Sequence, residues 1–542
     1  MKSRREFIAN TFKLSLAIGL GAGITSCKKA PYKYTTKAFE TNAGHIHRLI
    51  SQDFPVPKLR IQTKIAIIGS GVSGLACGRA LHKQGITDFA ILEAENQSGG
   101  NASYGHTPYA NFPWASHYMP IPNNENKEIL DFLAEAGIIT GYDAQGWPIY
   151  RESDLCFDPD ERLFINNRWQ DGIIPSLGVP PEGLHQMTRF FQLMTDFNAM
   201  KGNDGKYIFD IPIRTSSVDK SLDQLDQIPF ATYLKENGFN SPHLLWYLNY
   251  CCRDDFGAGI EKVSAFAGIH YFASRRGKGA NCDQNHFLTW ENGNGFLADQ
   301  LKSQLSTHIL PNQICFRIKK TESGFESYVF DIKRQVTKVI ESPFVVINTP
   351  LFVSKYLLQD FLTSEDLTWI QSREYFPWIT AGITLKSIKP SKGEPLSWDN
   401  VAYGSPCLGL VYAQHQHMTQ VPPFKKVFTY YRPFDSDSAK SERMRLHSMG
   451  EEEITKLILE DLKPLIQSPE DIEEIYFRIL GHGMISPGLG NLRNDASARI
   501  QKAMPRGLHL AHTDLSGYSV FEEGFYHGNA AAKNILQALN RA

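Results

Sequence analysis

One stretch, residues 64–101, constrains the fold of this chain more than any other, because it contains every part of a dinucleotide-binding unit in order. An apolar run at residues 65–68, typical of a buried parallel strand, leads directly into the glycine turn Gly69-Ser70-Gly71-Val72-Ser73-Gly74. The first glycine of such a turn permits the tight bend, the second lets a pyrophosphate approach the backbone, and the third lets the next helix pack closely. The apolar spacing after the turn predicts that helix up to Gly85, and then a second strand over residues 89–92.

The residues after the second strand indicate what the unit binds. Glu93 ends the strand, where a carboxylate can accept hydrogen bonds from both hydroxyls of an adenosine ribose that carries no 2′-phosphate. The glycine turn alone leaves NAD and FAD open. A second glycine pair, Gly99-Gly100, would let the chain pass along a diphosphate that continues towards a flavin, which favours FAD. The cofactor contacts predicted in this stretch are Gly69, Ser70, Gly71, Ser73, Gly74, Glu93, Ala94, Gly99, Gly100 and Asn101.

The first residues of the chain predict export. The pair Arg4-Arg5 precedes an apolar stretch at residues 14–24, which is too short for a hydrocarbon core that needs about twenty residues and is typical of a signal peptide. The arginine pair resembles a twin-arginine signal, and residues 24–27 resemble a lipobox in which Cys27 is acylated. We therefore expect export by the twin-arginine route to a periplasmic or cell-envelope location, with a lipid anchor at Cys27. The alternative is an uncleaved or conventionally cleaved signal with an incidental cysteine.

Composition excludes several classes of function. The formal net charge is −1, and residues 1–26 carry four basic residues and one acidic residue, so the remainder carries about −4. Such a balance leaves no basic surface for nucleic acid. The eight cysteines form no C-x-x-C pair, so no metal site is predicted.

A length of 542 residues is too great for one simple core, and the apolar patterns predict interrupted domains. We expect an α/β fold, a Rossmann-like FAD-binding domain with a discontinuous α+β substrate or cap domain. The expected segments are a signal at 1–27, a tether at 28–60, the FAD-binding domain at 61–124, 285–350 and 481–542, and the substrate domain at 125–284 and 351–480. The first part of the substrate domain is expected to be mainly helical, and the second part to contain an antiparallel sheet.

Two groupings are candidates for the substrate site. The aromatic and small residues at 111–120 closely follow the glycine pair, and we interpret them as lining the flavin, with a buried loop as the alternative. Trp114 and Ala115 are candidate cofactor contacts there, and Trp114 and His117 are candidate substrate contacts. In the helical part, the adjacent carboxylates Asp254-Asp255 could attract a cationic substrate, although such a pair also caps helices or pairs locally.

The C-terminal region resembles a known family. Residues 507–514 predict a strand that ends in an acid, and residues 521–524 lead into an alanine-rich helix. Ala511-His512-Thr513-Asp514, followed by Glu523-Gly524, resembles the closing motif of the flavin-containing amine oxidase superfamily. That group includes monoamine and polyamine oxidases, spermidine dehydrogenase and, more distantly, carotenoid desaturases.

The resemblance implies roles for several of these residues. Asp514 would bind the ribityl-pyrophosphate region of an FAD held without a covalent bond. The helix after Gly524 would point its N-terminus at the flavin and stabilise the charge of reduced flavin. Phe521, Glu523 and Gly524 complete the predicted cofactor contacts.

The chain also departs from the family pattern. Asn101 stands where the family usually has an arginine, and Phe521 stands at the position of a tyrosine in the family's aromatic cage. Tyr518 lies in a triplet that resembles the cage motif but is shifted along the chain. No lysine lies between Lys355 and Lys386, the region in which amine oxidases often carry a lysine that holds a water at flavin N5.

These observations predict an FAD-dependent oxidoreductase that transfers a hydride from a small substrate, an amine or amino acid, to flavin N5. The alternatives are a flavin-dependent desaturase or isomerase of an apolar substrate, and a non-catalytic flavin-binding protein. Substrate-site candidates are Trp114, His117, Tyr518 and Phe521, and no catalytic residue is assigned. The electron acceptor is left open between oxygen and a respiratory carrier, and the missing lysine favours the carrier.

Overall fold

The computed structural model describes residues 34–389, 391–418, 425–466 and 468–540. The predicted signal segment, with Arg4, Arg5 and Cys27, lies outside the described residues. Among the described helices, none combines the length and the apolar character needed to cross a membrane.

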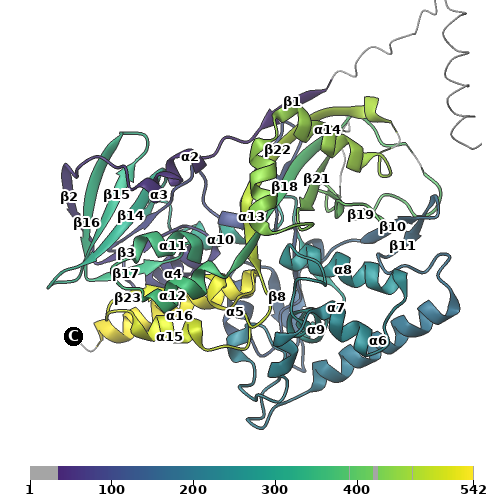
Figure 1. Ribbon diagram of the computed structural model, residues 1–542, viewed down its shortest axis with the longest axis horizontal. Coiled ribbons are helices and arrows are strands. Elements are labelled where there is room, and N and C mark those ends of the chain that lie inside the picture. Colours follow the sequence, from purple (N-terminus) through teal and green to yellow (C-terminus); the bar gives the residue numbers. More distant parts are fainter. Residues whose placement is uncertain (1–33, 390, 419–424, 467, 541–542) are drawn as a thin grey trace, which may run out of the picture.

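A five-stranded parallel sheet forms the centre of the nucleotide-binding region (Figure 1). Its strands, in spatial order, are β13 (Ile309–Leu310), β4 (Phe89–Leu92), β3 (Ile65–Ile68), β17 (Phe344–Ile347) and β23 (Leu508–Leu510). In the middle of the sheet, Ile67 of β3 lies opposite Ile91 on one side and Val346 on the other. The strands predicted at 65–68 and 89–92 are therefore confirmed, and sequence-distant strands complete the sheet.

Both faces of this sheet are buried, which is why its strands are continuous apolar runs. Ile65 and Ile67 pack into one core, whereas Ala66 and Ile68 pack into another, because successive side chains of a strand point to opposite faces. The first core includes helices α4 (Val72–Lys83), α5 (Lys127–Glu135), α10 (Gly295–Lys302) and α16 (Phe521–Leu539). The second includes α11 (Leu351–Leu357), α12 (Ser364–Gln371) and α15 (Ala496–Ala503).

Two further sheets flank this centre. A four-stranded sheet contains β14 (Gln313–Lys320), β15 (Phe325–Asp331), β16 (Val336–Ser342) and β2 (Leu59–Gln62). An eight-stranded sheet has the order β1 (Thr35–Ala38), β22 (Ile472–Ser486), β18 (Glu374–Leu385), β21 (Lys426–Pro433), β20 (Gly409–Tyr412), β19 (Asp399–Ala402), β10 (Glu161–Ile165) and β11 (Arg168–Asp171). The long strands β18 and β22 form the antiparallel pair at its core, so the antiparallel sheet expected in this part of the chain is present.

Helices cover the rest of the substrate region. Four of them build a separate apolar core: α6 (Pro181–Ala199), α7 (Phe230–Glu236), α8 (Pro242–Phe256) and α9 (Ala265–Ala273). Helices α13 (Ala439–Ser448) and α14 (Glu451–Leu462) pack on the eight-stranded sheet. The short strands are β5 (Tyr104–His106), β6 (Asn111–Pro113), β7 (Tyr118–Pro120), β8 (Ile139–Tyr142), β9 (Pro148–Tyr150) and β12 (Phe287–Thr289).

Two segments carry strands that the sequence analysis does not predict. Residues 34–60, expected as a tether, carry β1, α2 (Ala43–Ile46), α3 (Arg48–Ser51) and the start of β2. Strands β10 and β11 lie inside the segment expected to be mainly helical, and they extend the eight-stranded sheet. In each case the strand pairs with residues far along the chain, β1 with β22 and β10 with β19, and local apolar spacing carries no signal of such pairing.

Candidate cofactor and substrate site

The glycine turn after β3 has the geometry that a bound diphosphate needs. Gly69 adopts φ +101°, and a Cβ atom built on Gly74 would lie 2.0 Å from the Gly69 carbonyl oxygen, so α4 packs against the turn as closely as only glycine allows. Apart from its two chain neighbours, a Cβ atom on Gly71 would meet no atom of the described residues within 4 Å. The backbone of Gly71 is therefore open to the cavity, next to the unpaired amides of the first turn of α4.

Glu93 is fixed in place by the glycine turn and by the residues that follow it. Its Oε2 accepts hydrogen bonds from the Ser70 amide at 2.9 Å and the Ser70 hydroxyl at 2.5 Å, and its Oε1 accepts one from the Glu95 amide at 2.9 Å. Burial raises the pKa of Glu93, and these hydrogen bonds oppose the rise. A carboxylate in this position keeps lone pairs on Oε1 for the ribose hydroxyls of a dinucleotide.

The second glycine pair closes the other side of the turn. Gly99 and Gly100 adopt φ values of +116° and +59°, and a Cβ atom on Gly100 would lie 3.3 Å from Gly71 Cα. Asn101 follows, and its Nδ2 donates to the carbonyl oxygen of Gly483 in β22 at 2.7 Å. The side chain at the position of the family's arginine therefore ties the nucleotide-binding region to the substrate sheet.

The C-terminal motif contributes a carboxylate and a helix end. Asp514 lines the cofactor cavity, and its Oδ2 accepts hydrogen bonds from the Leu351 amide at 2.8 Å and the Tyr375 hydroxyl at 2.6 Å. Helix α16 begins at Phe521, four residues earlier than the prediction that it follows Gly524. Gly524 and Gly528 lie within α16 and let this helix pack closely on α4. A Cβ atom on Gly528 would lie 2.1 Å from the Ser73 carbonyl oxygen, so only glycine fits there.

These parts surround a cavity of about 300 Å³ whose lining fits FAD. Its lining includes the glycine backbone for a diphosphate, Glu93 for a ribose, and Asp514 shortly before the N-terminus of α16. Two buried side-chain oxygens in its lining, Asn348 Oδ1 and Gln313 Oε1, have no hydrogen-bond partner among the described residues. Such unpaired acceptors are expected where a polar ligand binds.

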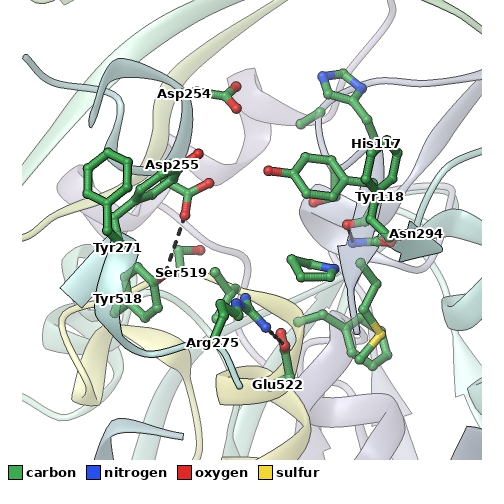
Figure 2. Close-up of a pocket in the computed structure, with 18 of the residues that line it drawn as sticks. His117, Tyr118, Asp254, Asp255, Tyr271, Arg275, Asn294, Tyr518, Ser519 and Glu522 are labelled. Carbon is green, nitrogen blue, oxygen red and sulfur yellow. Dashed lines mark hydrogen bonds and ion pairs between the residues drawn. The ribbon is translucent and has the colours of Figure 1, made fainter. Parts of the chain in front are cut away.

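A second cavity of about 710 Å³ adjoins the first. The two share Asn101, Ser116, Asn294, Gly483, Met484, Ser519, Val520 and Phe521 in their linings, so the N-terminus of α16 lies at the junction. In Figure 2, Asp254 and Asp255 of α8 lie on one side of this second cavity, and His117, Tyr118 and Asn294 lie on the other. We call the second cavity the substrate cavity.

Carboxylates and tyrosines dominate one side of the substrate cavity. Tyr518 lies beside the pair of aspartates and its hydroxyl donates to Asp255 Oδ2 at 3.3 Å. Burial raises the pKa of Asp255 to about 6, and the charge of Arg275 and the Tyr518 hydroxyl oppose the rise. Burial and the charges of Asp255, Asp399 and Glu161 raise the pKa of Asp254 well above its usual range. Glu161, also in the lining, has its pKa raised to about 8 by burial and by Asp399 and Asp160.

One ion pair lies at the N-terminus of α16. Arg275 forms it with Glu522, which is 2% exposed and belongs to the first turn of the helix. Glu523, the next residue, turns away and accepts hydrogen bonds from the Ile213 amide at 2.6 Å and the Ser516 hydroxyl at 2.7 Å. Glu522 therefore faces the substrate cavity, whereas Glu523 joins α16 to the loop before α7.

His117 is a neutral group in the opposite wall. Burial lowers the pKa of its imidazole to about 3, and its Nδ1 has no hydrogen-bond partner among the described residues. The centroids of its ring and the Tyr431 ring are 4.5 Å apart. A neutral imidazole with one free nitrogen can hydrogen-bond to a substrate but carries no charge to repel a cation.

The structure brings most of the predicted residues together. The cofactor cavity is lined by Gly69, Gly71, Ser73, Glu93, Ala94, Gly99, Gly100, Asn101, Asp514, Phe521 and Gly524, and the substrate cavity by Ala115, His117, Tyr518 and Phe521. Ser70, Gly74 and Glu523 act behind these linings, through the hydrogen bonds and close packing described above.

Trp114 is the exception, and its assignment to the flavin and substrate is corrected. It is 1% exposed, and its indole packs against Phe39, Phe112 and Tyr476 at ring-centroid distances of 5.1, 4.8 and 5.1 Å. Trp114 lines neither of the two cavities. A large apolar ring is stabilised by this aromatic cluster, whereas the neighbouring Ala115 remains at the cavity.

Sequence reasoning missed Glu161, Arg275, Glu522 and Asn294. Arg275 and Glu522 are far apart in the chain; Arg275 belongs to no recognised motif, and Glu522 lies within the C-terminal stretch 521–524 but has no assigned role in it. Asn294 offered the one available signal, because it lies between two glycines in the turn before α10. In the lining of both cavities, as far as the chain is described, no lysine occurs.

Comparison with known proteins supports these assignments for the nucleotide-binding part. The family model of the NAD(P)-binding Rossmann-like domain matches residues 67–136. Polyamine oxidase 7 of Oryza sativa subsp. japonica is 26% identical over 98 residues, which are 17% of this chain and 21% of that protein. The match thus spans about a fifth of the curated relative.

Solved structures extend the similarity to most of the chain. Wild-type putrescine oxidase bound to putrescine superposes with a TM-score of 0.62 at 15% identity, over 88% of this chain and all of that one. Cyclohexylamine oxidase from Brevibacterium oxydans IH-35A superposes with a TM-score of 0.60 at 17% identity, over 88% of this chain and 99% of that one. At such identities the likeness shows the fold, and it confirms the predicted α/β architecture.

Proposed function

We propose that this chain, which has the fold of the flavin-containing amine oxidase superfamily, is an FAD-dependent oxidoreductase that takes a hydride from a small amine. The fold and the cofactor cavity support the flavin. The observation that carries the substrate class is the acidic and aromatic wall of the substrate cavity, which adjoins the cofactor cavity at the start of α16.

The wall suits a cation. Asp254 and Asp255 project into the cavity beside Tyr271 and Tyr518 (Figure 2). Buried carboxylates whose pKa values are raised gain most when a positive charge binds beside them, and tyrosine faces attract cations. A protonated amine or ammonium group satisfies both, whereas an apolar substrate would bring no positive charge to the buried carboxylates.

Each part of the chain has a definite task in this reaction. FAD, when bound, accepts the hydride at its N5. The aspartates and tyrosines orient the amine, and the neutral His117 accepts or donates a hydrogen bond without opposing its charge. The N-terminus of α16, whose first residues carry no side-chain cap, places its partial positive charge where negative charge develops on reduced flavin.

Anaerobic reduction of the bound flavin tests the proposal. The protein is mixed with a panel of primary amines, diamines, amino acids and apolar alkenes, and loss of the oxidised-flavin absorbance is followed. We expect amines to reduce it, and Asp254→Asn to lower the reduction rate at limiting amine by about tenfold without releasing flavin. Asp131→Asn, at an exposed position of α5, is the matched control.

A contrary result has a clear meaning. Reduction by none of the amines, or equal rates for wild type and Asp254→Asn, would exclude the amine substrate while leaving the flavin assignment intact. Absence of any bound flavin would exclude the oxidoreductase.

We propose further that electrons leave the reduced flavin to an acceptor other than oxygen. The support is that the cavity linings, in the described residues, contain no lysine at which a water could be held near N5. Stopped-flow mixing of reduced protein with air-saturated buffer should give reoxidation much slower than turnover with a quinone acceptor. Reoxidation as fast as turnover would contradict the proposal.

The proposed location is the periplasm or cell envelope, with a lipid anchor at Cys27. The support is the pattern of residues 4–27 in the sequence alone. Arg4→Lys with Arg5→Lys should leave the folded protein in the cytoplasm, and Cys27→Ala should release it from membranes. Normal export of the double-lysine variant would contradict the twin-arginine route.

A further inference from the structure

The segment between the predicted signal and the glycine motif connects the eight-stranded sheet with the four-stranded sheet (Figure 1). Strand β1 pairs in parallel with β22 of the eight-stranded sheet, and β2 pairs in parallel with β16 of the four-stranded sheet. Residues 42–49, with helix α2 and the start of α3, lie between these two attachments. We call residues 42–49 the clasp.

Asn42 fastens the clasp to the loop that carries the ribose-binding carboxylate. Its Nδ2 donates to the Ala94 carbonyl oxygen at 2.7 Å and to Asn312 Oδ1 at 3.1 Å, and its amide donates to Glu95 Oε2 at 2.9 Å. The Glu95 amide in turn donates to Glu93 Oε1. One side chain of the clasp therefore supports the turn that positions Glu93.

Two apolar residues of the clasp reach the cofactor cavity itself. Ile46 and Leu49 both line it, and Leu49 is 3% exposed. Leu49 packs in the same core as Ile68, Leu92 and Ile314, the residues beneath that end of the cavity. The clasp is thus an integral wall of the cavity and not a linker that passes over the surface.

The order of the other lining residues shows which end of FAD this wall meets. The glycine turn would hold the diphosphate and Glu93 the ribose, so the adenine would lie on the far side of Glu93 from the turn. The cavity lining near Glu93 also includes Ala94, Glu95, Gln313, Ile314, Cys315, Ile46 and Leu49. Most are apolar and suit the faces of a purine. Gln313 Oε1 is buried without a partner among the described residues, and the exocyclic amine of adenine can donate to such an acceptor.

We propose that the clasp is part of the cofactor site: Ile46 and Leu49 cover the adenine of FAD, Asn42 holds them there, and retention of the cofactor depends on this cover. The inference rests on the proposed use of FAD. It assigns a binding role to residues upstream of the glycine motif, where the sequence predicts only a tether.

The test compares two nearby positions of the same segment. Ile46→Trp places a bulky ring in the space assigned to adenine, whereas Ile50→Trp makes the same change at a residue that is 68% exposed and next to Leu49. Apoprotein is titrated with FAD and, separately, with ADP, which carries the adenosine and diphosphate without the flavin. Ile46→Trp should raise the dissociation constants of both ligands by about tenfold or more, and Ile50→Trp should leave both unchanged.

A second variant guards against misfolding at Ile46. Asn42→Ala removes the side-chain hydrogen bonds to Ala94 and Asn312 without adding bulk, and it keeps the backbone hydrogen bond to Glu95. It should speed release of FAD from the holoprotein several-fold at a temperature well below the thermal midpoint of the apoprotein. Far-UV circular dichroism of the apoproteins checks that each variant is folded.

The outcomes separate this inference from the proposed function. If wild type binds FAD and ADP, and Ile46→Trp and Asn42→Ala bind them equally well, the clasp is no part of the site. If wild type binds neither ligand, the cofactor assignment itself fails. If Ile50→Trp weakens binding as much as Ile46→Trp, the effect is a general loss of stability and the specific role of the clasp is excluded.

Discussion

The cofactor cavity and the substrate cavity share part of their walls but differ in the kind of residue that lines the rest. At the diphosphate end of the cofactor cavity, Gly69, Gly71, Gly99 and Gly100 present backbone without side chains. Around the substrate cavity, the surface consists of charged and aromatic side chains such as Asp254, which come from separate elements. The diphosphate end of the first cavity depends on where side chains are missing, and the second cavity depends on which side chains meet.

This difference explains how the fold can keep one cofactor while substrates vary. A glycine backbone offers amides and close approach that suit any diphosphate. A wall of side chains can be changed one residue at a time without disturbing the strands that hold it. The cofactor cavity is therefore expected to be sensitive to added bulk, and the substrate cavity to changes of charge.

The largest expected effect comes from adding bulk to the backbone-built wall. Gly71→Val places a side chain in open space, because a Cβ atom at Gly71 has no atom of another described residue within 4 Å apart from its chain neighbours. Because Gly71 has φ −68°, the fold should tolerate the change, but affinity for FAD should fall by about a hundredfold or more. Titration of apoprotein with FAD measures it.

The control for this prediction is another glycine with open space. Gly141→Val, in β8, also meets no atom within 4 Å but lies outside both cavity linings. It should bind FAD like wild type. Equal binding by Gly71→Val and wild type would show that the diphosphate does not lie against this turn.

The next effect concerns charge in the side-chain-built wall. The pKa of Asp255 is about 6, so its carboxylate ionises as the pH rises through 6 and then attracts a cation. Affinity for a permanently charged probe, benzyltrimethylammonium, should increase by about tenfold between pH 5 and pH 7, as expected for one ionising group. Quenching of flavin fluorescence or a spectral shift on titration measures it.

Asp255→Asn should remove most of this pH dependence, since the probe has no titrating proton of its own. A neutral ligand of similar shape, such as neopentylbenzene, should bind independently of pH. If the affinity of the charged probe were flat across pH 5 to 7 in the wild type, the aspartate would not face the bound cation.

A smaller effect is expected at Tyr518. Its hydroxyl donates to Asp255 Oδ2 at 3.3 Å and helps to keep the pKa of that carboxyl from rising further. Tyr518→Phe should therefore shift the midpoint of the pH profile upwards and raise the KM for an amine about twofold at pH 6. An unchanged midpoint would show that the hydroxyl does not support the carboxylate, and flavin content serves as the control for folding.

The smallest effect on either cavity is expected at Trp114, which tests the corrected assignment. Trp114→Phe removes an indole whose Nε1 has no partner among the described residues and which packs in the cluster with Phe39 and Phe112. KM and FAD affinity should stay at wild-type values, while the free energy of unfolding should fall by about 1 kcal/mol. A changed KM would return Trp114 to the substrate site.

The sequence alone determined the cofactor region. The strand, glycine turn, helix and acid of residues 65–93 are consecutive, so their spacing by itself sets the geometry that the structure shows. The C-terminal motif could be recognised for the same reason, although the helix was predicted to follow Gly524 and α16 begins four residues earlier, at Phe521. A glycine inside a helix is explained only by the neighbour it approaches, here α4.

Tertiary structure decided the substrate cavity and the clasp. Whether Asp255 faces a ligand or pairs locally depends on Tyr518 and Arg275, which reach it only through the fold. Likewise, Asn42 is informative only once it lies against Ala94 and Asn312. The physical reason is that a glycine or a strand acts through its own backbone, which local sequence controls, whereas the charge state and partners of a buried polar side chain depend on residues brought there from elsewhere in the chain.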